Sequence, residues 1–351
     1  MTTRAEPRGH AHPFKGHPIL LAVVVLLLAE LAMRAASDRL PQPLVWHSLE
    51  AQTKVGQIDA LRDRGWHGGA VFLGTSMMNV ALDPTQLARE LGLRTPFAYN
   101  AALSAGTPRL MELWAKGVVL PKLRPRVLVI GLSSIDLNDA GHLRNALLKR
   151  YVGTVGARLS LGRASFTDRA EDVLSRWSAL VRFRRVFREP VTLWDSLRGR
   201  GPSDTAPEIG AFGVATHRRG ETFHLPDLAV PRAQGSLADY TTGPVEEGAV
   251  ARIIEMARRI GATVVIAKMP VTQEYIESHP RGLADYESFE RSLAAFATAH
   301  GVPVIDAQPA ASGHEFFADD LHLNGRGTAS FTSFMAAQFG KLDLTRLVSQ
   351  S

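Results

Sequence analysis

The stretch Val71-Phe-Leu-Gly-Thr-Ser-Met-Met-Asn-Val-Ala-Leu-Asp-Pro84 predicts a strand, a sharp turn and a helix in immediate succession. Its apolar run begins at Ala70 and ends at Leu73, and two small residues separate that run from Ser76. A serine placed there would lie at the carboxyl end of a strand and the amino end of a helix. Ligands of parallel sheets bind at that edge, and free N–H groups there can stabilise an oxyanion. A helix cap would also explain a Gly-Thr-Ser turn, so this stretch alone does not fix a function.

Further apolar runs continue the same rhythm along the chain. They are rich in β-branched residues and lack polar–apolar alternation, as strands buried on both faces do. Helical patterns lie between most of them, at residues 84–91, 108–120, 245–260 and 286–300. Alternation of strand and helix predicts a doubly wound α/β fold with a parallel sheet. The further predicted strands are residues 97–99, 126–130, 262–267 and 302–305.

A second informative segment is Phe316-Phe-Ala-Asp-Asp-Leu-His-Leu-Asn-Gly-Arg-Gly327, which precedes a last predicted helix. A serine nucleophile needs a base to take its proton and a carboxylate to orient that base. The spacing Asp-x-x-His puts Asp319 and His322 on one tight turn, where the carboxylate can hold one ring nitrogen while the other faces a serine. We therefore predict a triad of Ser76, His322 and Asp319. Asp320 is the alternative carboxylate.

The Gly-x-Ser turn and the Asp-x-x-His-Leu-Asn segment together resemble the SGNH/GDSL hydrolase family. The resemblance implies a three-layer α/β/α, flavodoxin-like fold with a five-stranded parallel sheet. It also favours Asp319, because the family keeps its aspartate three residues before the histidine. The segment 100–106 is similar to the family's second block, which implies that Gly106 donates a backbone N–H to the oxyanion together with that of Ser76. The third block, 127–138, lacks the usual asparagine, and Ser134 is the predicted substitute donor.

The N-terminus predicts a membrane anchor. Residues 1–18 are polar and basic, and residues 19–36 form an apolar stretch close to the roughly 20 residues that a spanning helix needs. Glu30 and Arg34 are four residues apart, so near the far interface they can pair on a helix or extend along it to the polar region. We expect a cytoplasmic tail followed by a signal anchor, with the rest of the chain outside the membrane. A cleaved signal peptide is the open alternative.

The remaining boundaries follow from composition. Residues 37–68 are expected to form a stalk, residues 69–340 the catalytic domain, and residues 341–351 a tail. An insertion of mostly helical character is expected at about 140–240, where the strand–helix rhythm stops. Its arginines are either a solvated helix face or a contact with lipid headgroups or an anionic polymer. The cluster consists of Arg182, Arg184, Arg185 and Arg188.

Composition excludes several classes of protein. The 351 residues include no cysteine, which excludes disulfides, a thiol nucleophile and Cys-ligated metals. The net charge is +6, but no nucleic-acid-binding motif accompanies it, so nucleic acid is not an expected partner. A metal-dependent hydrolase is also disfavoured, since the histidines are scattered without ligand spacing. No metal or other cofactor is expected.

The resemblance is nearest to SGNH proteins with an N-terminal anchor and a relaxed third block. Members of that branch often modify extracytoplasmic polymers, as in alginate acetylation or teichoic-acid alanylation, beside a membrane-bound O-acyltransferase. The resemblance therefore implies a serine esterase or O-acyltransferase at the cell membrane, acting on an acylated cell-envelope polysaccharide. A non-catalytic binding partner of the membrane acyltransferase is the alternative.

Overall fold

The computed structural model describes residues 17–40, 43, 45–46, 48–140, 151–184, 208–225 and 235–349. The chain divides by its contacts into two compact units. The smaller unit joins Met1–Pro43 to Phe166–Asp204, and the larger joins Leu44–Ser165 to Thr205–Ser351.

The larger unit is built on a five-stranded parallel sheet in the order β2-β1-β3-β4-β5. Its strands lie within two residues of the predicted bounds, and β1 to β3 are buried along their whole length, as their unbroken apolar runs require. This is the flavodoxin-like order, and the predicted fold class is confirmed. The strands are β1 (Ala70–Leu73), β2 (Ala98–Asn100), β3 (Val127–Leu132), β4 (Thr263–Lys268) and β5 (Val304–Asp306).

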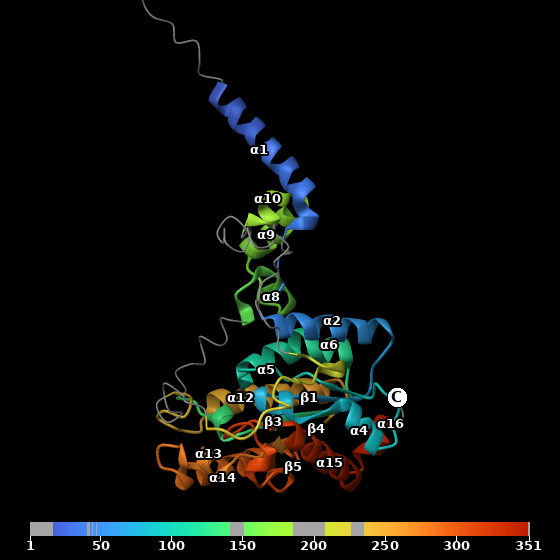
Figure 1. Cartoon of the computed structure of the whole chain (residues 1–351), viewed down its shortest axis with the longest axis vertical. Coiled ribbons are helices and arrows are strands. Elements are labelled where there is room, and N and C mark those ends of the chain that lie inside the picture. The colour runs from blue at the N-terminus through green and yellow to red at the C-terminus, as the bar shows by residue number, and fades with distance from the viewer. Residues whose placement is uncertain are drawn as a thin grey trace, which may run out of the picture. The chain divides into compact units, whose positions relative to one another are not determined.

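Helices cover both faces of this sheet. Figure 1 shows α2, α5 and α6 on one side and α13, α14 and α15 on the other. Phe339 of α15 stacks on Phe72 of β1, with ring centroids 5.9 Å apart. The helices are α2 (Leu49–Asp63), α3 (Ser76–Ala81), α4 (Pro84–Glu90), α5 (Pro108–Trp114), α6 (Leu120–Leu123), α8 (Val155–Ser160), α12 (Pro244–Arg259), α13 (Gln273–Glu277), α14 (Leu283–His300), α15 (Gly325–Lys341) and α16 (Leu344–Ser349).

The segment expected to form a stalk contains α2, which belongs to the larger unit. Ile58 and Leu61 of α2 are buried in the same core cluster as the strands. Two charged residues, Glu50 and Lys54, are buried on the same helix. Helix α2 therefore contributes to the core beside the sheet.

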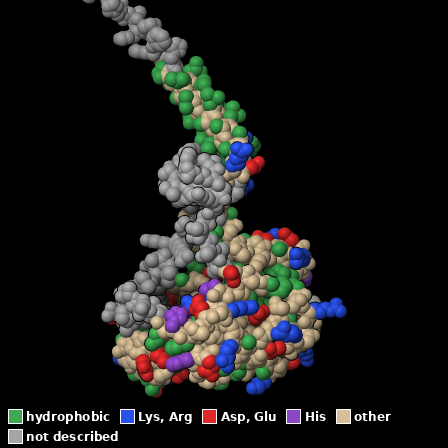
Figure 2. Space-filling view, in the orientation of Figure 1, with side chains coloured by type: hydrophobic (Ala, Val, Ile, Leu, Met, Phe, Trp, Pro, Cys, Tyr) green, Lys and Arg blue, Asp and Glu red, His purple; other side chains and the backbone are tan. Residues whose placement is uncertain are grey.

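The smaller unit contains α1 (His17–Ala36), α9 (Phe166–Trp177) and α10 (Ala179–Arg182). Within it, Pro18–Arg39 is long and apolar enough to cross a membrane, and none of its most apolar stretch is buried. Figure 2 shows the hydrophobic side chains that cover α1. Arg34 Nε donates to Glu30 Oε1 at 2.8 Å, so of the two arrangements considered for these residues the structure shows the pair.

Part of the predicted insertion belongs to this smaller unit. Two members of the arginine cluster are described there: Arg182 lies 5.3 Å from the centre of the Phe183 ring, and Arg184 pairs with Glu171. Arg185 and Arg188 lie outside the described residues.

Candidate active site

The turn between β1 and α3 sets the position of Ser76. Ser76 is the first residue of α3, and Thr75 before it is extended. Gly74 allows the turn, because a Cβ at that position would lie 2.6 Å from Cβ of Met78. The serine hydroxyl is thus held at the carboxyl end of a central strand, and its own N–H has no partner within the helix.

The structure brings Ser76, His322 and Asp319 together. His322 Nε2 lies 2.7 Å from Ser76 Oγ, and His322 Nδ1 lies 2.8 Å from Asp319 Oδ2. Asp319 Oδ1 also accepts the backbone N–H groups of Leu321 and His322, at 3.0 and 2.7 Å. The backbone N–H groups of the turn therefore hold the carboxylate of Asp319 in place, and that carboxylate orients the imidazole of His322. This arrangement can transfer the serine proton to Nε2 while Nδ1 keeps its own.

Arg218 is a contact of this turn that sequence reasoning missed. Its Nη1 lies 3.0 Å from Asp319 Oδ2 and 3.1 Å from Glu221 Oε2. Burial alone would raise the pKa of Asp319, but the hydrogen bond and charge of His322, the N–H of Leu321 and the charge of Arg218 together lower the pKa well below its ordinary value. Asp319 therefore stays ionised. The sequence around residue 218 does not indicate this contact, because Arg218 and Asp319 are about a hundred residues apart along the chain.

Replacing Arg218 by glutamine is expected to lower the free energy of unfolding by about 1–3 kcal/mol, because the buried Asp319 carboxylate loses a charged donor. The neighbouring Arg219→Gln is the matched control. Arg219 pairs with the more exposed Asp83, so its loss should cost less than about 1 kcal/mol. Urea unfolding of both variants checks the difference, and equal costs would contradict it.

The loop after β2 lies against the Ser76 turn. Leu103 donates its N–H to the carbonyl of Gly74 at 3.1 Å. The N–H of Gly106, the predicted oxyanion donor, donates to the carbonyl of Leu103 at 3.1 Å. Ala105 takes a left-handed backbone conformation, with φ of 55°, and its N–H has no acceptor among the described residues. The loop thus offers the N–H of Ala105 as a free donor. The sequence predicts Gly106 instead, because the resembled family's second block uses its glycine as the donor.

The structure places the hydroxyl of Ser134 in a different environment from the one predicted. Ser134 is fully buried, and its Oγ lies 2.8 Å from both Tyr275 Oη and His279 Nε2. His279 Nδ1 faces the carbonyls of Tyr275 and Ile276. In this second Ser–His pair the imidazole is therefore oriented by backbone carbonyls, whereas a carboxylate orients His322. Burial lowers the pKa of His279 and keeps it neutral. This cluster joins the turn after β3 to α13 and leaves Ser134 without a free donor for an oxyanion.

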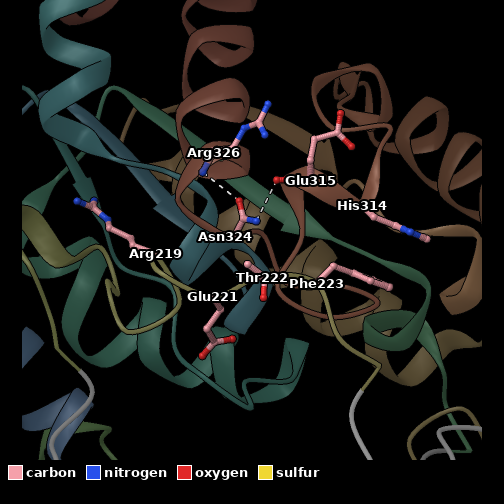
Figure 3. Close-up of a pocket in the computed structure, with 8 residues that line it drawn as sticks. All are labelled: Arg219, Glu221, Thr222, Phe223, His314, Glu315, Asn324 and Arg326. Carbon is pink, nitrogen blue, oxygen red and sulfur yellow. Dashed lines mark hydrogen bonds between the residues drawn. The ribbon is translucent and has the colours of Figure 1, made fainter.

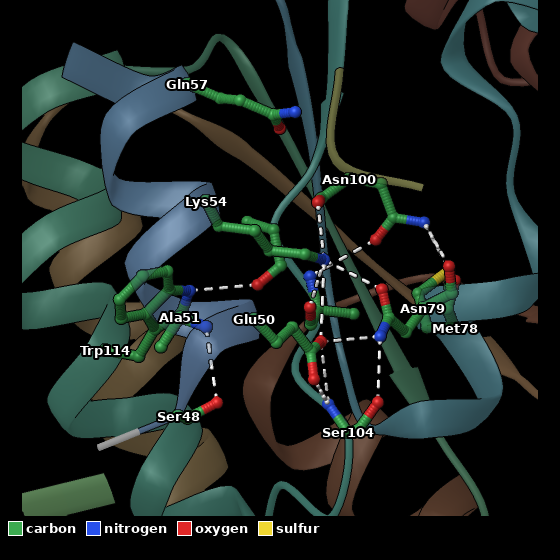
Figure 4. Close-up of polar contacts among 12 residues, drawn as sticks. Ser48, Glu50, Ala51, Lys54, Gln57, Met78, Asn79, Asn100, Ser104 and Trp114 are labelled. Carbon is green, nitrogen blue, oxygen red and sulfur yellow. Dashed lines mark hydrogen bonds and ion pairs between the residues drawn. The ribbon is translucent and has the colours of Figure 1, made fainter. Parts of the chain in front are cut away.

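A buried polar network holds the Ser76 helix, the loop after β2 and α2 together (Figure 4). Lys54 Nζ donates to Asn79 Oδ1 at 2.7 Å and to the carbonyls of Asn100 and Ala102 at 3.1 and 2.5 Å. Glu50 accepts Asn79 Nδ2 at 2.6 Å.

The same carboxylate reaches the loop that carries Ala105. Ser104 directly precedes Ala105, and Glu50 accepts the N–H of Ser104 at 3.0 Å. The network therefore fixes the loop relative to α3. Sequence reasoning missed it, although charged residues on the apolar stripe of α2 (Lys54 lies four residues before Ile58) were a visible signal.

A surface hollow of about 340 Å³ opens next to this turn (Figure 3). It includes Asn324, two residues after His322, and Glu221, the partner of Arg218. Phe223 and His314 stack in parallel with ring centroids 4.0 Å apart. The hollow therefore combines a flat ring pair with charged groups. Its lining residues are Arg219, Glu221, Thr222, Phe223, His314, Glu315, Asn324 and Arg326.

The chain was compared with known families, curated proteins and solved structures. No protein-family model matches the sequence. No curated protein matches it either. Among solved structures, a GDSL-like lipase from Bacteroides thetaiotaomicron is 13% identical, with 78% of this chain and 88% of that chain covered and a TM-score of 0.35. An aryl esterase of M. Smegmatis is 14% identical, with 78% and 100% covered and a TM-score of 0.35. A carbohydrate acetylesterase from Sinorhizobium meliloti is 12% identical, with 78% and 99% covered and a TM-score of 0.36.

Likenesses at this level carry no argument about activity, so the class of the protein rests on its own sheet and turn geometry. The larger unit has a three-layer α/β fold with the sheet order β2-β1-β3-β4-β5, the flavodoxin-like arrangement that the resemblance to SGNH/GDSL hydrolases implied. Ser76 follows the first strand, and the Asp-x-x-His turn precedes α15.

Proposed function

We propose that this protein is a serine-dependent acyl-ester hydrolase or O-acyltransferase that works through an acyl-enzyme on Ser76. The observation that carries the proposal is the continuous chain of contacts from Ser76 Oγ through His322 to Asp319, at 2.7 and 2.8 Å. Hydroxyl nucleophiles are weak unless a base removes their proton.

The reaction would proceed in two balanced halves. Ser76 Oγ attacks the ester carbonyl as His322 Nε2 takes the hydroxyl proton, and the N–H groups of Ser76 and Ala105 hold the oxyanion. Collapse breaks the bond to the alcohol, which leaves with the proton from His322. Water or a second hydroxyl then attacks the acyl group with His322 again as base, the bond from the acyl carbon to Ser76 Oγ breaks, and His322 returns the proton to Ser76. Water gives a hydrolase and a sugar hydroxyl gives an acyltransferase.

The substrate class that fits best is an acylated polysaccharide of the cell envelope. The hollow beside the Asp319–His322 turn supports this, since a flat ring pair suits the face of a sugar and its charged rim suits polar substituents. A membrane-bound O-acyltransferase would supply the acyl group if transfer is the reaction.

The location proposed is the cell membrane, with α1 as a retained single-pass anchor and the larger unit on the extracytoplasmic side. Contacts of Glu30 with Ser178, Ala179 and Leu180 support retention, because cleavage behind α1 would remove them all.

The test combines covalent labelling with product analysis. The detergent-solubilised full chain should react once with a fluorophosphonate probe, as intact mass would show, and tandem mass spectrometry of its digest should place the adduct on the peptide that contains Ser76. Acetylated oligosaccharides supplied with and without an alcohol acceptor then separate acetate release from ester transfer. A folded chain that is inert to the probe and to every ester would overturn the proposal.

A non-catalytic partner of a membrane acyltransferase is the second candidate. One observation favours it, namely that the hydroxyl of Ser134 is engaged elsewhere, which removes the predicted third oxyanion donor. Inertness of the folded chain, together with co-purification of a membrane acyltransferase, would support this candidate.

A further inference from the structure

Helix α9 exposes the face that an amphipathic helix normally buries. Apolar residues recur along it with the spacing of one helical face, at 166, 170, 173, 174 and 177. Phe166 is 86% exposed and Trp177 is 77% exposed. On the opposite face Asp168 is buried. The polar side of α9 thus turns toward the protein and the apolar side away from it, which is the reverse of a helix designed for water.

This helix is attached to the end of the apolar segment of α1. Arg34 Nη2 donates to the carbonyl of Trp177 at 2.5 Å. The Glu30 carboxylate accepts the hydroxyl of Ser178 at 2.8 Å and the N–H groups of Ala179 and Leu180 at 2.8 and 3.0 Å. The last residue of α9 therefore lies beside the turn of α1 where charged residues first interrupt the apolar run.

The charges around the apolar face fit the boundary between lipid and water. Arg169 and Arg176 border that face, while the acidic residues Asp168, Glu171 and Asp172 lie on the other side of the helix. Arginines beside an apolar face, with a tryptophan at its end, are typical of helices that lie in the headgroup region.

We propose that α9 lies in the headgroup region of the bilayer that α1 spans, with Phe166, Val173, Leu174 and Trp177 inserted into lipid. Lipid is the occupant because α9 ends at Trp177, whose carbonyl accepts Arg34 at the end of the apolar run of α1. Along that run, residues 19–28 carry their large apolar side chains 42–72% exposed. The proposal rests on α1 as a membrane span and is independent of the reaction at Ser76.

The absence of cysteine from the chain makes each introduced cysteine unique. Val173→Cys and Trp177→Cys report the apolar face, and Ser175→Cys reports the opposite face. Leu26→Cys reports α1, and Arg259→Cys reports water, since Arg259 is 75% exposed in the larger unit. Val173 and Trp177 are exposed, so their replacement removes no core packing. Each full-length variant is labelled with an environment-sensitive fluorophore and placed as a single copy in a lipid nanodisc.

The expected result is that lipids with a shallow nitroxide quench positions 173 and 177 at least about twofold more than position 175. Aqueous iodide should quench position 259 and spare 173 and 177. Deeply placed nitroxides should quench position 26. Iodide quenching at 173 and 177 would overturn the proposal. Shielding of both positions from iodide and from lipid nitroxide would also overturn it, since another protein segment would then cover the face. Absence of lipid quenching at position 26 would show that α1 does not lie in the bilayer, and this result would also overturn the proposal.

Discussion

Ser76→Ala and His322→Ala are each expected to lower kcat for ester hydrolysis by roughly 10⁴–10⁶-fold. The reason is that nucleophile and base act as one unit, so removal of either stops proton transfer through the 2.7 Å contact between Ser76 Oγ and His322 Nε2. For the same reason the double variant should be no slower than the single variants by more than about tenfold. Release of p-nitrophenol from p-nitrophenyl acetate measures all three.

Two further variants make this prediction specific. Asp319→Asn should keep the turn but impose the wrong imidazole tautomer, with a loss of about 10⁴-fold. Ser134→Ala should leave kcat within about twofold, because its hydroxyl is bonded to Tyr275 and His279, whereas loss of a true oxyanion donor costs about 10²–10³-fold. A folded Ser76→Ala protein that hydrolyses the ester at the wild-type rate would show that the triad does not take part in the reaction.

Lys54→Met is expected to lower the free energy of unfolding by about 3–5 kcal/mol, although Lys54 is not in contact with the triad. The change leaves Asn79 Oδ1 and the carbonyls of Asn100 and Ala102 without their buried donor. It also leaves the Glu50 carboxylate, 3.9 Å away, buried without its cation. The midpoint of urea unfolding measures the loss.

The matched control is Lys116→Met. Lys116 is exposed, so the same substitution there should change stability by less than about 0.5 kcal/mol. Lys54→Met should also lower kcat in the fraction that remains folded, because the network fixes Ser104 directly before Ala105. Equal stability of the two variants would show that the network is not needed for the fold.

The cost of Lys54→Met should grow as pH rises from about 8 to 10.5. Burial lowers the pKa of Lys54 to about 8 from its usual 10.5, and the charge of Glu50 offsets only part of that effect. Between these values the unfolded chain holds more protons than the folded chain, so the unfolding free energy of the wild type rises with pH. The methionine variant lacks this contribution. Urea unfolding at several pH values tests this, and a constant gap between the two proteins would contradict it.

Much of the architecture could be predicted because it depends on local patterns. Strands β1, β3 and β4 are short apolar runs without polar–apolar alternation, as expected for strands that helices cover on both faces. The Asp-x-x-His spacing confined Asp319 and His322 to one turn, since three residues cannot hold them far apart. The pair between Glu30 and Arg34 followed from the helical spacing in the same way.

Contacts between distant segments could not be predicted. Arg218 reaches Asp319, and Lys54 reaches the loop after β2, only because the fold closes these distances. Ser134 was chosen by its place in a family block, but the position of a hydroxyl depends on its neighbours. Tyr275 and His279 come from α13 and the turn behind it, far along the chain.

The sequence by itself determined the class of fold, the apolar N-terminal helix and the three residues that meet at the turn, because periodicity and short spacing act within a few residues. Only the tertiary structure decided which N–H groups on the loop are free, which charges are buried together and which face of α9 is exposed. These properties depend on which groups pack beside each other in the folded chain. A polar group that is buried without a hydrogen-bond partner costs free energy, so its neighbours decide whether its position is tolerated.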